Sequence, residues 1–426
     1  MGNDSGQVTR RSVLAAGAAM TPHKADATAP HLPTPEILKT YIGFGDKASG
    51  GAGDMASLAW MEGQLQAFGY QTRRQAIDVP FFTARSTRLR SEIFDLKLEP
   101  QAQVMTTGAG GLTAPLARLD GFPKPGAIVV AALPYRRWSS ASSPEILAAG
   151  RAAVSARASG LILVTTGPTG EALALNVPAE RRLFELPTAV LAPAAARPVL
   201  DAATRGDTAT LIVDGDAGRR PAFNLIGRLD RGAAKTLILS TPRSGWYGCG
   251  GERGPGVVVW LRLAQWAVSA LPGFNIVLIS ASGHEYDNHG AHAFLKTEAP
   301  KPGETALWVH LGANVAARDW REAAMGMLSP LPSADPQRIL MGSTEFVPML
   351  GTVFAGEPGL EAPLAAGAAA AGELDEIFKA GYTRAFGVFG AHRFHHARSD
   401  DARCVEPALI DRLVPKFKAA IRAALA

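Results

Sequence analysis

The sequence predicts an α/β fold in which a mostly parallel sheet is sandwiched by helices and carries a smaller inserted αβ module rich in β-strands. From residue 224 onward, short apolar runs such as 237–240 alternate with helical segments such as 256–271. These runs are continuously apolar, which is typical of strands that are covered on both faces. Functional sites in sheets of this kind form in the loops at the carboxyl ends of the strands.

Periodicity and composition predict the individual elements in chain order. Apolar residues at helical spacing predict a helix over residues 54–68. Residues 92–214 differ, because short β-rich runs there surround an Ala-rich helical segment at 146–158. The predicted strands are 127–130, 161–164, 189–191, 210–213, 237–240, 275–280 and 307–311, and the later helices are 256–271, one that starts at 290 and an amphipathic closing helix from 407.

Composition excludes several classes of protein. Of the 426 residues, 47% are hydrophobic and 19% are charged, so the chain can form a sizeable core and two domains. The net charge is +5, and no block of lysine and arginine indicates a nucleic-acid groove. No apolar run reaches the ~18–20 residues of a membrane-spanning helix. Two cysteines, Cys249 and Cys404, exclude a disulfide scaffold and a zinc ribbon.

The N-terminus has the pattern of an export signal. Arg10 and Arg11 precede a short stretch of small, weakly apolar residues at 13–20, and residues 25–27 offer a small-x-small cleavage site. This pattern predicts a twin-arginine signal, and therefore a periplasmic or secreted protein. A disordered basic tail is the alternative, and residues 1–30 are left out of the predicted fold in either case.

A glycine-rich loop follows the predicted strand 237–240 and leads into the next helix. Its glycines permit tight backbone turns, and it carries Cys249, Glu252 and Arg253. These side chains are expected near a helix N-terminus, where a thiolate or a carboxylate is favoured. A purely structural turn is the alternative.

Histidines are concentrated in the last third of the chain. Directly after the predicted strand 275–280, His284 and Glu285 are adjacent, and such a pair can supply a proton-transfer group and a metal ligand side by side. The segment is not an H-E-x-x-H zinc helix, because its fifth position is Asn288. His396 and Asp400 are four residues apart, so Asp400 could orient the imidazole. A polar loop and a surface histidine patch are the alternatives.

The order of these pieces resembles the M28 family of zinc aminopeptidases, whose fold glutaminyl cyclases share. The motifs follow one another in the same order as in that family. They are Asn224-Leu-Ile-Gly, a strand, a glycine-rich loop, a strand that leads to X-Glu, another strand, and His-x-x-x-Asp before the last helix. The similarity covers residues 34–90 and 220–426, and the intervening segment resembles the protease-associated (PA) domain of many such peptidases. After the signal or disordered segment at 1–30, the resemblance implies a catalytic domain from 31–91 and 219–426 and a PA-like insert at 92–218.

The site of this family normally holds two zinc ions through five side-chain ligands, and the sequence departs from that pattern. Thr241-Pro242-Arg243 stands where the family has His-x-Asp, and Glu252 stands where it has the bridging Asp. His284-Glu285 stands in place of Glu-Glu, and Gly312, with His310 two residues earlier, stands in place of an Asp. The last histidine ligand is kept as His396. The resemblance therefore implies at most one zinc, held by Glu252, Glu285 and His396. A metal-free site is the alternative, because Arg243 and Arg253 add positive charge.

Three functions stay open at this point. The first is an exported hydrolase or acyl-transfer enzyme that acts on an amide- or peptide-like bond, with one zinc and with His284 as the proton shuttle. The second is a metal-free hydrolase, lyase or isomerase. In it His284 or His310 is the base, and Cys249 is the nucleophile. Arg243 or Arg253 binds an anionic substrate or stabilises developing negative charge. The third is a non-catalytic protein that binds peptides or glycans.

The expected partner is a small-molecule or peptide-like substrate. Trp246, Tyr247, Tyr286 and Trp308 suggest an aromatic or apolar face for it, and core packing explains these residues equally well. For Cys249, a buried thiol or a disulfide with Cys404 are the alternatives to a nucleophile.

Overall fold

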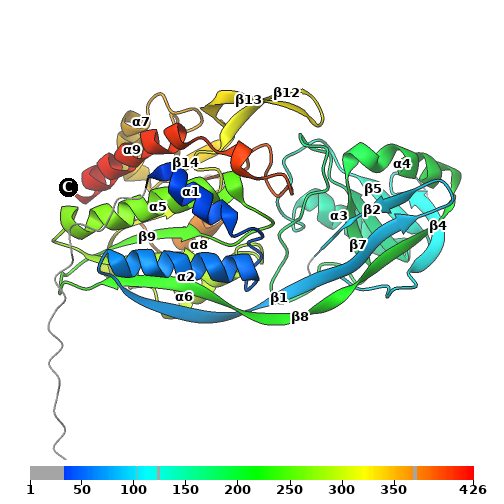
Figure 1. Cartoon of the computed structure of the whole chain (residues 1–426), viewed down its shortest axis with the longest axis horizontal. Helices are drawn as coiled ribbons and strands as arrows, with labels where there is room; N and C mark the ends of the chain where they lie inside the picture. The colour runs from blue at the N-terminus through cyan, green and yellow to red at the C-terminus, as the bar shows by residue number, and fades with distance from the viewer. Residues whose placement is uncertain (1–32, 102, 122–124, 368–371) are drawn as a thin grey trace, which may run out of the picture.

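The computed structural model describes residues 33–426 except for 102, 122–124 and 368–371. The predicted export signal therefore lies outside the described residues. Figure 1 shows a main lobe and a smaller insert lobe joined by two long strands, β1 (Gln71–Arg90) and β8 (Thr208–Leu229). We define the insert lobe as residues 91–207 together with the adjoining ends of β1 and β8.

The main lobe is built on a mostly parallel sheet, as predicted. Its parallel strands lie in the order β16 (Ala385–Gly390), β11 (Thr305–Leu311), β9 (Thr236–Pro242) and β10 (Asn275–Ala281). At the edges, β14 (Arg338–Gly342) is antiparallel to β16, and β8 is antiparallel to β10. The short strand β15 (Leu364–Ala365) pairs with β14.

Helices cover both faces of this sheet because alternate strand residues point to opposite sides. Leu237 and Leu239 pack in one core, whereas Ile238 between them packs in another. The first core is covered by α1 (Thr34–Gly43), α2 (Ala52–Ala67), α5 (Gly250–Ala270), α7 (Val347–Val353) and α9 (Pro407–Leu425). The second is covered by α6 (His289–Thr297) and α8 (Glu373–Lys379).

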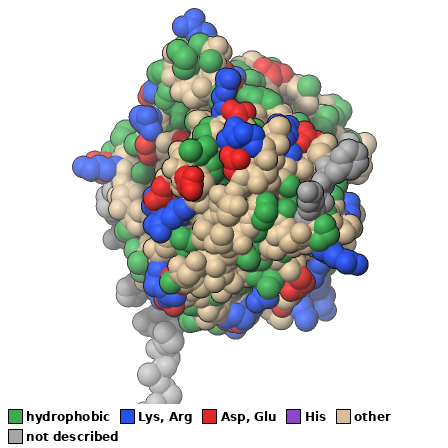
Figure 2. Space-filling model, turned by 90° about the vertical axis from the view of Figure 1, so that its right-hand side faces the viewer, with side chains coloured by type: hydrophobic (Ala, Val, Ile, Leu, Met, Phe, Trp, Pro, Cys, Tyr) green, Lys and Arg blue, Asp and Glu red, His purple; other side chains and the backbone are tan. Residues whose placement is uncertain are grey.

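The insert lobe has its own core, and its strands continue the large sheet through the antiparallel pairing of β4 with β8. Its strands β4 (Leu112–Arg118), β5 (Ile128–Ala132), β6 (Gly160–Val164) and β7 (Thr188–Leu191) are parallel, with α3 (Pro144–Ser155) and α4 (Ala196–Arg205) beside them. Two short strands, β2 (Asp95–Lys97) and β3 (Glu99–Pro100), pair with β1 and β7. On the outer end of this lobe, side chains of both charge signs are interspersed (Figure 2).

The structure differs from the sequence-based expectation in the long strands and in one helix. β1 pairs with β8 from Gln71 opposite Arg228 to Arg90 opposite Thr210, so the expected boundary at 218/219 falls inside a continuous strand. Many of their residues are polar and exposed, which hid this ribbon from a search for apolar runs. Helix α5 begins at Gly250 rather than at residue 256, because glycines and Pro255 in its first turns read as a loop.

The two lobes also share an apolar core. It combines Trp138 and Leu175 of the insert lobe with Tyr286 and Phe394 of the main lobe. Trp320 belongs to the same core and lies on the hairpin of β12 (Arg318–Ala324) and β13 (Met327–Ala334), which the sequence did not predict. The insert lobe is therefore packed against the loops that follow the parallel strands. Within the described residues, no helix is both long and apolar enough to cross a membrane.

Candidate active site

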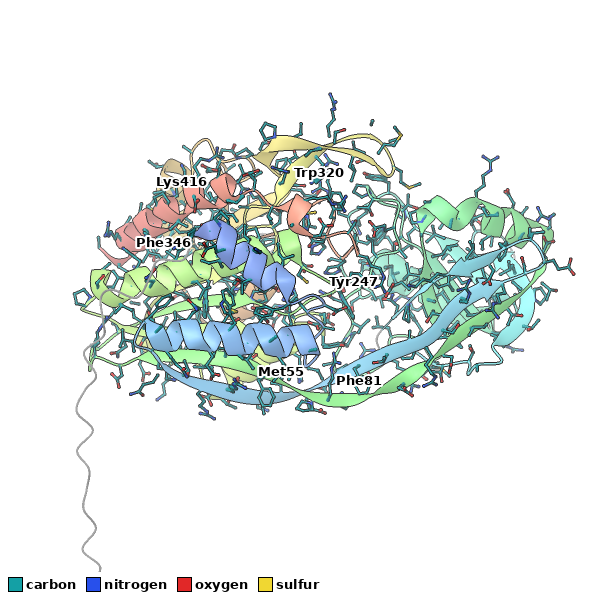
Figure 3. The ribbon with its side chains drawn as sticks, viewed as in Figure 1. Met55, Phe81, Tyr247, Trp320, Phe346 and Lys416 are labelled. Carbon is teal, nitrogen blue, oxygen red and sulfur yellow. The ribbon has the colours of Figure 1, made fainter. Side chains whose placement is uncertain are left out.

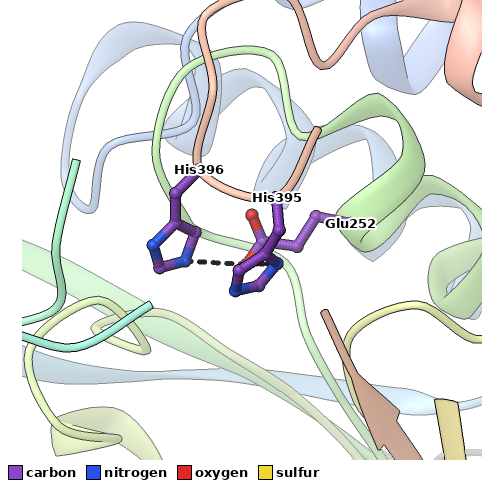
Figure 4. A group of neighbouring side chains, drawn as sticks. All are labelled: Glu252, His395 and His396. Atoms are coloured by element: carbon purple, nitrogen blue, oxygen red, sulfur yellow. Dashed lines mark ion pairs between the residues drawn. The ribbon is translucent and has the colours of Figure 1, made fainter. Parts of the chain in front are cut away.

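Two loops at the carboxyl ends of parallel strands bring candidate residues together. Glu252 lies in the first turn of α5, after β9, and His395 and His396 lie in the loop after β16. The Oε1 atom of Glu252 is 3.4 Å from His396 Nε2 and 4.0 Å from His395 Nδ1 (Figure 4). All three side chains are buried, and each offers one atom that could bind a metal ion.

The two histidines are held differently. Their rings stack with centroids 4.0 Å apart. His396 has a left-handed backbone, with φ of 60°, and its Nδ1 lies 2.9 Å from the carbonyl oxygen of Ala174 in the insert lobe. Because a carbonyl only accepts, His396 Nδ1 carries a proton, and in the neutral ring Nε2 turns a lone pair toward Glu252. His395 Nδ1 has no hydrogen-bond partner among the described residues.

Arg253 is the cation nearest to Glu252 in this group. Its Nη2 lies 2.7 Å from Glu252 Oε1, and its Nε donates to the carbonyl oxygen of Ser244 at 3.0 Å. Burial raises the pKa of Glu252, but the charges on Arg253 and on the two histidines outweigh burial and hold that pKa well below its usual value. Burial lowers the pKa of Arg253, and Glu252 more than restores it. The centre therefore contains a buried carboxylate and a guanidinium.

Glu285 does not join this group. Its carboxylate accepts the backbone N–H of Ser49 at 2.6 Å and the hydroxyl of Ser244 at 2.8 Å. Burial raises the pKa of Glu285, and these hydrogen bonds oppose the rise. Within the described part of the chain, His395 rather than the expected Glu285 lies beside Glu252 and His396.

A second polar cluster contains His284 and His310, together with a residue that the sequence analysis missed. His284 Nδ1 lies 3.2 Å from Glu373 Oε1, and the other oxygen of Glu373 is 3.9 Å from His310 Nδ1. His310 also contacts Ser240 Oγ at 2.9 Å. Glu373 starts α8 directly after an Ala/Gly-rich segment. A carboxylate at a helix start was the only sequence signal for Glu373, and it is a common one.

Burial sets the protonation states in this second cluster. Burial and the charge on Arg253 lower the pKa of His284, while Glu373 opposes them. Burial lowers the pKa of His310 to about 4. For Glu373, the two histidines and Arg253 outweigh burial and lower the pKa. The His284 side chain keeps 12% of its surface exposed, so it is the member of the cluster that a substrate could reach.

Cys249 is a buried thiol in the structure. It is 0% exposed, and its Sγ donates to the carbonyl oxygen of Trp246 at 3.0 Å. Burial, and then the charge on Glu252, raise the pKa of this thiol well above its usual value. The thiolate expected beside a helix N-terminus is therefore disfavoured. Cys404 is buried as well, and both cysteines are free, so they form no disulfide.

Asp400 supports α5 rather than His396. Its carboxylate accepts the backbone N–H of Gly251 at 2.6 Å and that of Glu252 at 3.1 Å. It faces His392 Nε2 at 3.3 Å. The Nδ1 atom of His396, which Asp400 was expected to orient, faces Ala174 instead. The physical reason is that loop residues from the insert lobe reach this histidine first.

Arg243 is a structural residue here. Its Nε lies 3.0 Å from Asp54 Oδ1, and its other nitrogens donate to the carbonyl oxygens of Ser280 and Phe223. Arg243 is fully buried, and burial lowers its pKa. It is therefore not placed to bind an anionic substrate.

A cleft of about 650 Å³ lies between the lobes, beside the site loops. Figure 3 shows Tyr247 of the loop after β9 and Phe81 of β1 facing the space between the lobes. Trp246 lines the same cleft, and Tyr286 borders it although it is 2% exposed and packs in the core shared by the lobes, whereas Trp308 does not reach the cleft and packs in another core. Three of the four aromatic residues singled out from the sequence thus line one open space.

Solved structures resemble this arrangement over nearly its whole length. A zinc aminopeptidase from Bacillus subtilis matches 92% of this chain and 94% of its own, with 14% identity and a TM-score of 0.70. An M28 peptidase precursor from Shewanella amazonensis matches 94% of both chains, with 15% identity and a TM-score of 0.69. An aminopeptidase from Aneurinibacillus sp. strain AM-1 matches 94% of this chain and 96% of its own, with 14% identity and a TM-score of 0.65.

The chain has the zinc-aminopeptidase fold. The resemblance drawn from the order of motifs is thereby confirmed at the level of fold. No family model matches the sequence, and no curated protein matches it either. At 14–15% identity the zinc-aminopeptidase fold is shared while the side chains of the site are free to differ, so the chemistry has to be argued from the residues themselves.

Proposed function

We propose that this chain is an enzyme that hydrolyses an amide- or peptide-like bond, or transfers its acyl group, at a centre formed by Glu252, His395 and His396. This centre holds at most one zinc ion. One carboxylate and two imidazoles are a suitable donor set for a zinc site with one open position. The zinc-aminopeptidase fold supports the reaction class, because the loops that form the centre are the ones that carry sites in such sheets.

The orientation of His396 is the observation that carries the proposal. With its proton on Nδ1, its Nε2 lone pair points at Glu252 Oε1 across 3.4 Å. Two electron-rich atoms at this distance repel each other unless a cation or a further proton lies with them, and Arg253 Nη2, 2.7 Å from Oε1, is one such cation. Among the described residues, Glu252 Oε2 has no hydrogen-bond partner, and Oε1 has the ion pair with Arg253 but no aligned hydrogen bond. These features fit a bound metal ion.

The bound zinc would polarise the carbonyl group of the substrate. Beside it, His284 is the partly exposed imidazole that moves a proton between the attacking nucleophile and the leaving group. Glu373 holds the Nδ1 side of His284 and leaves its Nε2 for this task. The cleft that Trp246, Tyr247 and Tyr286 line belongs to the neighbouring loops and does not include the centre itself; its aromatic lining suits a small peptide-like molecule with an apolar or aromatic side chain. Export through a twin-arginine signal to the periplasm or medium is part of the proposal.

A metal-free enzyme is the second candidate, and the position of Arg253 favours it. Its guanidinium lies 2.7 Å from the oxygen that a zinc ion would need. In this version Arg253 supplies the positive charge at the centre and His284 stays the proton-transfer group. The reaction would then be a hydrolysis, a lyase step or an isomerisation.

Metal content distinguishes the two candidates. Purified protein is equilibrated with zinc, passed over a desalting column and analysed by mass spectrometry, beside the variants Glu252→Gln, His395→Gln and Glu285→Gln. We expect Glu252→Gln and His395→Gln each to lose one zinc per chain relative to the parent, and Glu285→Gln to keep it. Loss of zinc in Glu252→Gln and Glu285→Gln, with zinc kept in His395→Gln, would instead support the ligand set expected from the sequence.

Activity is then measured on a panel of aminoacyl amides and short peptides, with and without a chelator. Activity that disappears with the chelator and returns with zinc supports the first candidate. Chelator-resistant activity, with the same zinc content in the parent and in Glu252→Gln, overturns it and supports the metal-free enzyme.

A further inference from the structure

A second group of potential metal ligands lies beside the candidate active site and plays no part in the proposed reaction. His392 and Asp400 are in the loop after β16, and Cys404 ends the short helical turn that follows it. The three side chains are at most 1% exposed. One imidazole nitrogen, one carboxylate oxygen and the sulfur all lie within 4.8 Å of one another.

His392 is the unexplained member of this group. It is 0% exposed, yet neither of its ring nitrogens has a hydrogen-bond partner among the described residues. Its Nε2 lies 3.3 Å from Asp400 Oδ2, but without the alignment of a hydrogen bond. A buried imidazole whose one polar contact is poorly aligned and whose Nδ1 has no partner costs free energy, and a missing ligand at this ring explains both features.

The start of α5 leaves space for these three side chains and holds one of them, Asp400, in place. A Cβ atom on Gly251 would lie 2.7 Å from His392 Cε1 and 3.0 Å from Cys404 Cβ, so only glycine fits at this point of α5. The backbone N–H groups of Gly251 and Glu252 hold the carboxylate of Asp400. Carboxylates that bind metals are commonly fixed by such hydrogen bonds and keep lone pairs for the ion.

We propose that His392, Asp400 and Cys404 bind a second divalent ion of the zinc type, which ties the loop 391–404 to the start of α5. Imidazole, carboxylate and thiolate together are a donor set that zinc prefers over calcium or magnesium. In a tetrahedral zinc site, neighbouring ligand atoms lie about 3.4 Å apart, and the 3.3 Å between His392 and Asp400 matches this spacing. The sulfur lies within 4.8 Å of the other two ligand atoms, so it has to approach them by about 1.4 Å at most.

Binding has a defined chemical balance. The Cys404 thiol loses its proton to solvent as the metal–sulfur bond forms, and His392 binds through a neutral nitrogen. Because the ligands are buried, the ion enters as the loop folds. The role of this ion is structural: Asp400 holds the backbone of Glu252, so the ion fixes the position of that residue. The proposal does not depend on the proposed function, since it shares no ligand with the centre at Glu252.

Cobalt spectroscopy tests this site directly, because only a thiolate ligand gives a sulfur-to-cobalt charge-transfer band in the near ultraviolet. The full-length protein is refolded with Co²⁺, and its spectrum is compared with those of Cys404→Ser and Cys249→Ser. Cys249 is the matched control, since it is the other buried free thiol and lies outside this group. We expect the band in the parent and in Cys249→Ser. We expect Cys404→Ser to lose the band and to bind one cobalt ion fewer per chain than the parent.

Absence of the band in the parent would overturn the proposal without any variant, and would leave His392 and Asp400 as an ion pair. A band that is lost in Cys249→Ser but kept in Cys404→Ser would also overturn it, because the thiolate would then belong to the centre at Glu252. His392→Gln, which keeps the thiol, is expected to weaken cobalt binding at least tenfold. Glu252→Gln is expected to keep the band while it loses the other ion, which separates this proposal from the proposed function.

Discussion

The Nδ1 atom of His396 lies 2.9 Å from the carbonyl oxygen of Ala174, although 222 positions separate them in the chain. Ala174 belongs to the insert lobe, and its own N–H donates back to the carbonyl oxygen of His396 at 3.2 Å. Nearby, the N–H of Val177 donates to the carbonyl oxygen of Glu285 at 3.1 Å. The insert lobe therefore sets the orientation of site residues as well as covering them.

Asn176 offers a way to test this coupling. Its Oδ1 accepts the indole N–H of Trp246 at 2.9 Å, which fastens the insert loop to the loop after β9. We expect Asn176→Ala to lower the free energy of unfolding by about 1 kcal/mol. We also expect it to reduce kcat/KM roughly tenfold, because His396 loses part of its support. Urea unfolding and steady-state kinetics measure the two effects.

Ser159→Ala is the matched control for that variant. Ser159 also lies in the insert lobe and donates to a backbone carbonyl, that of Gly126 at 2.8 Å, but it does not touch the site loops. It should change stability by a similar or smaller amount and leave kcat/KM as it is. Equal kinetic losses in both variants would show that the insert lobe acts only through global stability.

Arg253 and a zinc ion compete for the same oxygen of Glu252. We expect Arg253→Gln to tighten zinc binding about tenfold or more, because a positive charge 2.7 Å from that oxygen is removed. In a chelator, the same variant should be less stable by about 3 kcal/mol, since the buried carboxylate loses its partner. Zinc titration against a competing chelator and urea unfolding give both values. Weaker zinc binding in this variant would mean that Arg253 supports the metal site.

Glu373 is expected to position His284 for proton transfer. Glu373→Gln should reduce kcat by about 10- to 100-fold with little change in KM, because the imidazole loses the carboxylate 3.2 Å from its Nδ1. Glu376→Gln is the control: Glu376 lies on the same helix and pairs with another histidine, His292, at 3.0 Å. Comparable losses of kcat in the two variants would contradict a specific role for Glu373.

His310 should make the protein sensitive to acid. Burial lowers its pKa from 6.5 to about 4 in the folded protein, among His284, Arg253 and Glu373. Between these two pKa values the unfolded chain binds a proton that the folded chain does not, so stability falls as the pH falls. From about pH 7 to pH 5 the loss from this group is about 2 kcal/mol.

The variant His310→Asn isolates this contribution, because the other histidines still titrate in it. Urea unfolding across the pH range should show a shallower decline for His310→Asn than for the parent. Parallel declines would mean that His310 is protonated in the folded protein, in conflict with its burial.

Particular residues show what could be predicted. The strands at 237–240, 275–280 and 307–311 were predicted because each is a continuous apolar run, and they form β9, β10 and β11. The position of Glu252 at the start of a helix followed from its glycine-rich surroundings. By contrast, Glu373 was not found, since a single carboxylate at a helix start carries no pattern that distinguishes it from many others. The β1–β8 ribbon was missed because its exposed residues are polar.

The sequence by itself determined the zinc-aminopeptidase-like fold, because hydrophobic periodicity and motif order are local properties that survive at 14–15% identity. It also determined which loops carry the reactive side chains, since those loops follow buried parallel strands. Only the tertiary structure decided which side chains meet. Glu285 is bound by Ser49, His395 stands beside Glu252, and Cys249 is enclosed as a thiol. Such contacts depend on side-chain directions and on loops far apart in the chain, and no local pattern records them.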